Sequence, residues 1–401
     1  MQNLVDSLST QSNDDSYSVY VHIPFCSHRC DYCDFATWTD KDELIEKYID
    51  TVINQWRFHV ETQQDIVGKK LRSIFFGGGT PNLIEAKYLV RIIEAVKSSS
   101  GSIASNCEIT VESNPDQISL SQMQTYANGG VNRISVGVQS TNQDVLNYLG
   151  RKHRADKISQ AIDDVTGAGI TNFSCDLIYG SGNESIKTFE KSLLDVIALK
   201  PNHISAYSLG VEKQTPLYKS ISLGLKPDVD EDDLADKYEL ADSVLSEHGY
   251  KWYEISNWSK PGHESLHNLS YWRGIDVIAL GCAAHGHTNK QRWATPRDID
   301  RYVERFESSL SSNKFEDLFS VIVPNKTIGM DLESFALKLR TREGIYWPDE
   351  SFDSKLNRFI DDGFCEYDEA TKSIFLSLKG RLLAHSVTLE LFESYAPLQL
   401  L

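Results

Sequence analysis

The sequence predicts an α/β fold, in which a partial barrel of parallel strands is followed by a small winged-helix-like α+β domain. Three observations support this prediction. Between residue 18 and about residue 258, short apolar or β-branched runs alternate with segments of helical periodicity. Most segments between the runs are long enough for the crossover helix that parallel strands require. From Asn325 the pattern changes to helices around one short hairpin.

Six runs are the predicted strands of the barrel. Most are unbroken apolar or β-branched runs, as expected for parallel strands covered on both faces. They are Ser18–Ile23, Ser73–Phe76, Glu108–Val111, Arg133–Val136, Asn172–Ile178 and His203–Ser208. Repeated strand–helix units of this kind favour a parallel sheet or an open barrel. Another strand is expected at Lys251–Ile255.

The helices of the barrel are expected between these strands. Asp42–Val60 and Glu85–Val96 are two such crossover segments. Asp230–His248 has one apolar stripe, and Asp230 can cap its start while Gly249 ends it.

The C-terminal part has a different pattern. Asp331–Leu339 and Asp349–Asp361 are predicted helices. Phe364–Tyr367 and Ser373–Leu376 are predicted to form a hairpin, and a further helix follows from Lys379. Helices with a short hairpin are typical of a winged-helix-like domain.

The length of 401 residues fits two domains at roughly 100–200 residues each. We expect a disordered tail over residues 1–17 and a barrel domain with its extension over residues 18–310. The winged-helix-like domain is expected over residues 325–401. The boundary is marked by the Ser/Asn-rich stretch Ser308–Asn313.

The composition excludes several classes of protein. Hydrophobic residues make up 40% and charged residues 24%, as in ordinary globular proteins. The net charge of −17 repels phosphate backbones, so no nucleic-acid partner is expected. No apolar stretch reaches the roughly 20 residues of a transmembrane helix, and the polar segment Met1–Tyr17 is no secretory signal. A cytoplasmic location is therefore expected.

Three of the seven cysteines are close together directly after the first predicted strand. Cys26, Cys30 and Cys33 have the spacing C-x3-C-x2-C, which suits a metal site in a reducing compartment. Thiolates are the usual ligands of iron–sulfur clusters, and three of them leave one iron of a [4Fe–4S] cluster open. Zinc, the less favoured alternative, needs a fourth ligand such as His22 or His28. The remaining cysteines are expected to be inert: Cys107, Cys175, Cys282 and Cys365.

The cysteine spacing resembles that of radical S-adenosylmethionine (SAM) proteins. The wider string from His22 to Phe35 resembles the branch that contains oxygen-independent coproporphyrinogen III oxidase and the HemW-type heme chaperones. The resemblance covers nearly the whole chain. It implies a partial (β/α)6 radical SAM barrel and a [4Fe–4S] cluster on the three cysteines. It also implies exchangeable SAM on the open iron, where the reduced cluster splits it to a 5′-deoxyadenosyl radical.

Other motifs lie where barrel strands end, which is where such folds place their chemistry. The run Phe75–Pro81 resembles the family's SAM-binding Gly-Gly-Gly-Thr-Pro, and Glu112 can accept hydrogen bonds from ribose hydroxyls. Some members of the family bind a second SAM near the residues that match Gln139, Arg151 and Asp176. The alternative role for these three residues is structural hydrogen bonding within the barrel mouth. The resemblance implies these SAM contacts: Tyr20, Tyr32, Gly78, Gly79, Thr80, Glu112, Gln139, Arg151, Asp176 and Gly210.

Two features favour the chaperone branch over the oxidase. The oxidase pattern has a fourth cysteine, C-x3-C-x2-C-x-C, and Phe35 occupies its place here. The string His267-Asn-Leu-Ser-Tyr271-Trp272 is similar to a chaperone signature. Its imidazole can ligate heme iron, and its aromatic rings can pack on a macrocycle. A loop histidine satisfied by its neighbours is the alternative. His285 is expected to line the same cavity.

The leading hypothesis is a heme chaperone that binds heme, a [4Fe–4S] cluster and SAM, and transfers heme to an acceptor protein. The implied partners are a respiratory enzyme as acceptor, a low-potential electron donor and, transiently, a membrane complex. The first alternative is an enzyme, the oxygen-independent coproporphyrinogen III oxidase (a dehydrogenase), which converts propionates to vinyl groups. A radical SAM enzyme acting on RNA is the second alternative, and the net charge argues against it.

Overall fold

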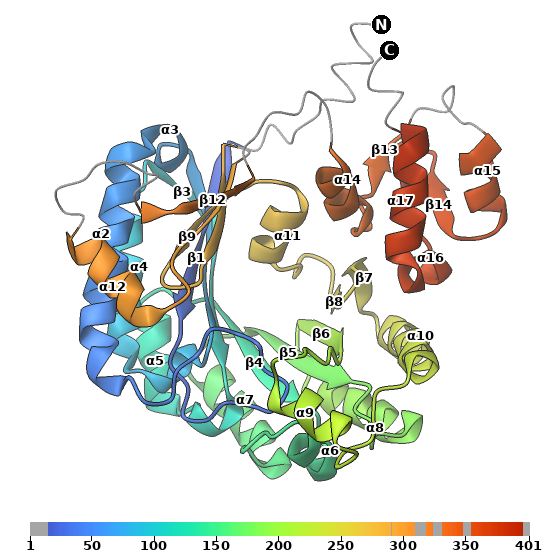
Figure 1. Cartoon of the computed structure of the whole chain (residues 1–401), viewed down its shortest axis with the longest axis horizontal. Coiled ribbons are helices and arrows are strands. Elements are labelled where there is room, and N and C mark those ends of the chain that lie inside the picture. Colours follow the sequence, from blue (N-terminus) through green and yellow to red (C-terminus); the bar gives the residue numbers. More distant parts are fainter. Residues whose placement is uncertain (1–14, 290, 309–317, 324–330, 348–353, 396–401) are drawn as a thin grey trace, which may run out of the picture.

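The computed structural model describes residues 15–289, 291–308, 318–323, 331–347 and 354–395. In this part of the chain the main element is a twelve-stranded sheet, and its centre is six parallel strands that lie in sequence order (Figure 1). They are β1 Ser16–Ile23, β2 Lys70–Gly78, β3 Ser102–Ser113, β4 Arg133–Gln139, β5 Asn172–Tyr179 and β6 His203–Ser208. The predicted partial barrel is confirmed.

Helices cover the outer face of this curved sheet (Figure 1). They are α2 Ile45–Thr62, α4 Ala86–Ser99, α5 Leu120–Asn128, α7 Ile158–Gly167, α8 Ile186–Ala198 and α10 Glu231–Glu247. Three short helices are also present, α3 Gln64–Val67, α6 Gln143–Tyr148 and α9 Pro216–Ser222, and α6 and α9 share a separate hydrophobic cluster. The predicted cap of α10 is present, because the Asp230 carboxylate accepts hydrogen bonds from the Asp232 and Asp233 amides at 2.9 and 3.1 Å. Gly249 follows with a φ of 78°, which glycine adopts without strain.

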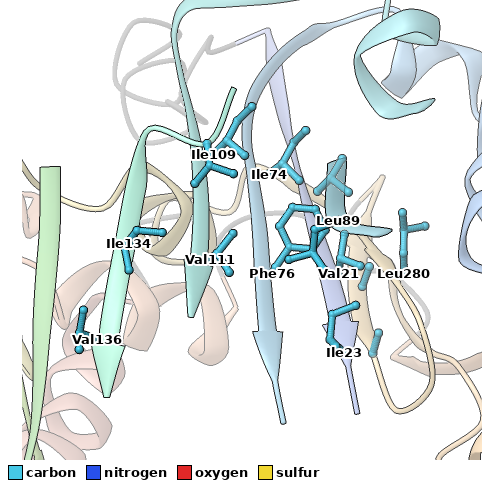
Figure 2. Packing of buried hydrophobic residues seen from close by; sticks show 14 of the residues in the cluster. Val21, Ile23, Ile74, Phe76, Leu89, Ile109, Val111, Ile134, Val136 and Leu280 are labelled. Atoms are coloured by element: carbon cyan, nitrogen blue, oxygen red, sulfur yellow. The ribbon is translucent and has the colours of Figure 1, made fainter. Parts of the chain in front are cut away.

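Strand alternation separates a helix-facing side from a barrel-facing side. In β4, Ile134 and Val136 join the hydrophobic core, whereas Arg133, Ser135 and Gly137 line the interior cavity. Figure 2 shows part of this core between the sheet and α4: Val21, Ile23, Ile74, Phe76, Leu89, Ile109, Val111, Ile134, Val136 and Leu280. Apolar side chains therefore hold the helices on the sheet, and polar ones face inward.

Both edges of the six-stranded centre are extended. Beyond β6 lies β8 Asn257–Ser259, which is antiparallel to β6, and then β7 Lys251–Glu254, which is antiparallel to β8. Beyond β1 lie β9 Asp276–Leu280, β10 His285–Thr288, β11 Gln291–Ala294 and β12 Ser320–Val323. Helix α11, Leu266–Trp272, lies between the two edges and contacts β1, β2 and β9 (Figure 1). Helix α12, Ile299–Ser308, packs against α2.

The C-terminal part contains a three-stranded antiparallel sheet in the order β13, β15, β14. The predicted hairpin is confirmed as β14 Cys365–Asp368 paired with β15 Ser373–Leu376, and β13 is Ile345–Tyr346. The helices are α14 Leu332–Leu339, α15 Ser354–Asp361, α16 Leu378–Leu382 and α17 Ala384–Tyr395. The first five residues of the helix predicted at Asp349–Asp361 lie outside the described residues.

The end of the N-terminal tail differs from the prediction, and the boundary predicted between residues 310 and 325 can be compared only in part. The tail predicted over residues 1–17 is too long, because β1 begins at Ser16 and Tyr17 is buried with its ring stacked on Trp56. The large sheet continues past residue 310, since β12 pairs with β11. Residues 310 and 325 themselves fall in segments outside the described residues.

No helix of the described residues has the length and apolar character needed to cross a bilayer.

A buried arginine joins the C-terminal part to the barrel. The Arg381 guanidinium donates two hydrogen bonds to the Asp242 carboxylate of α10, at 2.9 and 3.0 Å. It also lies over the Trp252 ring, 4.3 Å from its centroid. Buried bidentate pairs of an arginine with a carboxylate are among the stronger ion pairs in proteins.

We predict that Arg381→Ala lowers the free energy of unfolding by about 3 kcal/mol, because it leaves the Asp242 carboxylate partly buried without its partner. Thermal and denaturant unfolding measure the change. Arg358→Ala is the matched control, since Arg358 is exposed and its ion pair is with the exposed Asp362, directly after the end of its own helix. Its loss should cost no more than about 0.5 kcal/mol. Equal effects of the two substitutions would contradict the role given to Arg381.

Candidate functional site

A cavity of about 530 Å³ lies inside the barrel, within the usual size range of ligand pockets. The cluster, SAM and heme residues predicted from the sequence all line it. They are Tyr20, Cys26, Cys30, Tyr32, Cys33, Gly78, Gly79, Thr80, Glu112, Gln139, Arg151, Asp176, Gly210 and His267. Residues spread over about 250 positions of the sequence are therefore brought to one site.

The three clustered cysteines lie on the loop after β1, at one part of the cavity wall. All three thiols are free. The Cys26 sulfur accepts a hydrogen bond from the Thr80 hydroxyl at 3.6 Å, and the Cys30 sulfur accepts one from Arg151 Nη1 at 3.6 Å. Burial raises the pKa of the Cys26 and Cys33 thiols. Within the described residues, no three His, Cys, Asp or Glu side chains converge on the position of a single metal ion.

The glycine-rich end of β2 passes close to the cysteine loop. Gly78 has a φ of 110°, and a Cβ at this position would collide with the His22 imidazole. A Cβ on Gly79 would lie 3.0 Å from the Cys26 sulfur and 2.7 Å from the Phe25 carbonyl oxygen. Only glycine fits these two positions, so bare backbone faces the cavity beside the thiols.

Glu112, at the end of β3, faces the same backbone. Its Oε2 accepts a hydrogen bond from the Gly78 amide at 3.1 Å. Burial, and secondarily the negative charge of Asp176, raises the pKa of Glu112 to about 7. A carboxyl with this pKa can accept or donate a hydrogen bond near neutral pH.

Three serines hold the Asp176 carboxylate in place. Oδ1 accepts hydrogen bonds from the hydroxyls of Ser174 at 3.0 Å and Ser205 at 2.7 Å, and Oδ2 accepts one from Ser135 at 2.8 Å. The carboxylate is thus fixed on the inner surface of β5 before any ligand binds.

Gln139 and Arg151 form the next part of the wall. Gln139 has a φ of 62°, which is strained for a residue with a Cβ, and it follows an irregularity in the pairing of β4 with β5. Arg151 Nη2 donates hydrogen bonds to Asn114 Oδ1 at 2.5 Å and to the Gly137 carbonyl at 3.1 Å. Both side chains are positioned at the cavity by the strand ends.

His267 lies on α11 and is only 2% exposed. Its ring stacks on Phe75 at a centroid distance of 4.8 Å and on Tyr20 at 6.2 Å. Burial, with a smaller effect of the Arg133 charge, lowers the pKa of His267 to about 3, so the imidazole is neutral at physiological pH. Nε2 is buried and has no hydrogen-bond partner among the described residues.

A chain of hydrogen bonds between serine hydroxyls determines which ring nitrogen of His267 is protonated. The Ser270 hydroxyl donates to the Leu266 carbonyl at 2.9 Å, so its 2.8 Å contact with Ser18 uses the Ser18 hydrogen. The Ser73 hydroxyl donates to Ser18 at 2.8 Å and has no hydrogen left for His267. His267 Nδ1, 2.9 Å from Ser73 Oγ, must therefore be the donor. Nε2 is left with a free lone pair at the cavity.

Other residues of the chaperone-like motifs have different positions. Phe35 is 64% exposed and lines the cavity, and Tyr271 lines it as well. The expectation for His285 is wrong: it lies on the short strand β10 with an exposed side chain and is not part of the cavity lining.

Arg133 and His203 also line the cavity, although neither is in a motif that predicts a site from the sequence. His203 donates or accepts at both ring nitrogens, with Ser174 Oγ at 2.9 Å and the Tyr253 hydroxyl at 2.8 Å. Both residues start predicted strands. Alternate residues of a strand face the same side, so a polar residue at a position that faces the barrel interior could have indicated both of them.

Residues 20–196 match the model of the radical SAM superfamily. The chain is 36% identical to the heme chaperone HemW of Escherichia coli, over 67% of this chain and 69% of that protein. Identity to the heme chaperone HemW of Synechocystis is 34%, over 82% of this chain and 79% of that protein. Coproporphyrinogen III oxidase (HemN) of E. coli superposes with a TM-score of 0.74 over 97% of this chain and 93% of that one. Its sequence identity is only 19%, so it shows similarity of fold alone.

The raised pKa of Glu112 predicts how stability depends on pH. Between about pH 4.5 and pH 7 the folded state binds the proton that the unfolded state has lost, so stability falls as the pH rises through this window. The side chain is still in contact with solvent in the cavity, which reduces the effect. We therefore expect the free energy of unfolding of the ligand-free protein to fall by about 2 kcal/mol over this pH window because of Glu112. Glu112→Gln should lose correspondingly less.

Denaturant unfolding at about pH 5 and about pH 8 measures the difference between the two proteins. Glu85→Gln is the control, since Glu85 is exposed and should leave the pH profile unchanged. A Glu112→Gln profile parallel to that of the wild type would show that the pKa of Glu112 is not raised.

Proposed function

The chain belongs to the family of HemW heme chaperones within the radical SAM superfamily, and on this premise we propose that it binds heme and transfers it to an acceptor protein. The proposal rests on one observation above all. His267 lines a cavity of ligand size, and its buried Nε2 has a free lone pair and no partner among the described residues.

The family implies a [4Fe–4S] cluster and SAM, and the residues present fit both. Three free thiols share the cavity wall, and we assign Cys26, Cys30 and Cys33 to the cluster. Gly78 and Gly79 also line the cavity, and the close packing of Gly79 on Cys26 places this backbone beside the thiols. When bound, the cluster supplies one electron to the sulfonium of SAM.

We assign the remaining predicted contacts to SAM. Glu112 suits ribose hydroxyls, because its carboxyl can take either role in a hydrogen bond near neutral pH. Asp176 and Arg151 are held in place by their own hydrogen bonds, so they can position a ligand without losing side-chain entropy. The other contacts assigned on the resemblance are Tyr20, Tyr32, Thr80, Gln139 and Gly210.

We assign His267 to the heme iron. Neutral imidazole is a common axial ligand of heme. Donation from Nδ1–H to an oxygen raises the basicity of the opposite nitrogen and fixes the ring, and Ser73 Oγ supplies that oxygen here. The Phe75 ring, stacked on the imidazole, further limits its rotation. A ligand nitrogen is thus prepared before heme arrives.

The chaperone is favoured over the oxidase. The oxidase resemblance in structure concerns the fold alone, and Phe35 stands where the oxidase pattern has its fourth cysteine. We further propose a cytoplasmic location, a heme-dependent respiratory enzyme as acceptor and a low-potential electron donor for the cluster. A transient contact with a membrane complex would follow from that choice of acceptor.

Replacing Cys26, Cys30 and Cys33 together by Ala should abolish a stable [4Fe–4S] cluster, because no thiolate ligands remain at the cavity. Iron and acid-labile sulfide are determined after anaerobic reconstitution, together with the visible absorption spectrum. Cys107→Ala is the control, because Cys107 lies on β3 away from the cavity lining, and it should keep its full iron content. Full iron and sulfide content in the triple variant would refute the cluster assignment.

His267→Ala should weaken hemin binding at least about tenfold, because the iron loses its axial nitrogen. Hemin titration followed by the Soret band gives the dissociation constant and the ligation state. Ser73→Ala should weaken binding by about tenfold through the loss of the Nδ1 acceptor.

His285→Ala is the matched control, since this histidine is exposed and outside the cavity lining. A well-folded wild-type protein that binds no hemin would refute the chaperone proposal. Anaerobic conversion of coproporphyrinogen III to a vinyl product would establish the oxidase instead.

A further inference from the structure

Arg133 is a buried cation at the inner end of the cavity. It is the first residue of β4, pairs with Thr110 of β3 and Asn172 of β5, and is only 2% exposed. Its side chain lines the cavity, and its Nε has no hydrogen-bond partner among the described residues. A guanidinium has five N–H donors and stays charged at every physiological pH.

No hydrogen bond joins Arg133 to the neighbouring carboxylates among the described residues. Glu112 Oε2 accepts from the Gly78 amide, and both oxygens of Asp176 accept from serines. Both ring nitrogens of His203 are also engaged. Glu254, on the strand β7 of the sheet extension, is paired with Arg340 at 2.7 Å.

A charge buried without a hydrogen-bonded partner is costly, and native proteins rarely keep one without a reason. A ligand that brings an anion into the cavity would remove this cost. The planar fork of a guanidinium matches a carboxylate better than any other common anion except phosphate. Neither heme nor SAM has a phosphate, and both have carboxylates.

We propose that Arg133 anchors an anion subsite that binds a carboxylate of the ligand in the cavity. The inference deepens the proposed function and rests on it for the choice of ligand. Arg133 and His267 line the same cavity, and each has one buried nitrogen, Nε and Nε2, without a hydrogen-bond partner among the described residues. Heme offers a metal for the one and a propionate for the other. The carboxylate of a SAM molecule is the second source of the same group.

The test compares each ligand with a form that lacks the carboxylate. The dissociation constants of hemin and hemin dimethyl ester are compared, and so are those of SAM and decarboxylated SAM. Each ligand is titrated into the wild type and into Arg133→Met. The wild type should bind the acid form of one of these ligands about 10- to 100-fold more tightly than its carboxylate-free form. Arg133→Met should lose that preference and bind the carboxylate-free form as the wild type does. Arg133→Lys should keep part of the preference, because it keeps the charge but not the fork.

The two arms identify the source of the carboxylate. Loss of the preference in the hemin arm assigns the subsite to a propionate, and loss in the SAM arm assigns it to the amino-acid carboxylate. An unchanged preference in both arms overturns the inference. If the wild type binds no hemin, the proposed function fails, and the SAM arm alone decides whether the subsite exists.

Stability separates this role from a structural one. Without ligand, Arg133→Met should be at least as stable to heat as the wild type, because it removes a buried charge that has no partner. A marked loss of stability would show that Arg133 supports the fold and would overturn the proposal. Arg154→Gln is the control for both measurements, because Arg154 is exposed and pairs only with Asp156.

Discussion

The need to satisfy polar groups on the inner face of a buried sheet governs this structure. Helices cover the outer face, so the outward residues of each strand are apolar, and every second residue must face the barrel interior. In this protein many of the inward residues are polar. Burying them is favourable only if each finds a hydrogen-bond partner, either within the protein or on a ligand. The fold and the site are therefore consequences of the same alternation.

Most inward groups find their partners within the protein. Three serines hold Asp176, and Glu108 accepts hydrogen bonds from the first amides of α11, Leu266 at 3.0 Å and His267 at 3.2 Å. A carboxylate at a helix N-terminus is favourable because amides there have no partner within the helix. This contact fixes the start of α11 and thereby the position of its histidine. The nitrogens of His267 and Arg133 are among the buried side-chain atoms that have no such partner among the described residues, and both of these residues line the cavity.

The barrel strands could be predicted because unbroken β-branched runs are a strong local signal. The cysteine spacing was equally direct, since cluster ligands lie close together in the sequence. No helix was predicted at the position of α11, because seven residues are too few to show a helical period. The strand that begins at Arg133 was predicted, but the anion-binding role proposed for this residue was not. That role depends on whether side chains from four other segments form hydrogen bonds with the guanidinium. The protonated nitrogen of His267 depends on serines more than 190 residues away, which sequence patterns do not link.

The C-terminal part supports the same histidine from the outside. Helix α14 contacts α11, and the Arg340 guanidinium lies over the Trp272 ring at 4.5 Å while donating to Glu254. Arg273, at the end of α11, forms an ion pair with Glu343. Helix α11 is thus held at its start by an acid of the barrel and at its end by charged residues of the C-terminal part. A short helix has little stability of its own, so these contacts set the position of His267. The C-terminal part thereby belongs to the construction of the site, although none of its residues line the cavity.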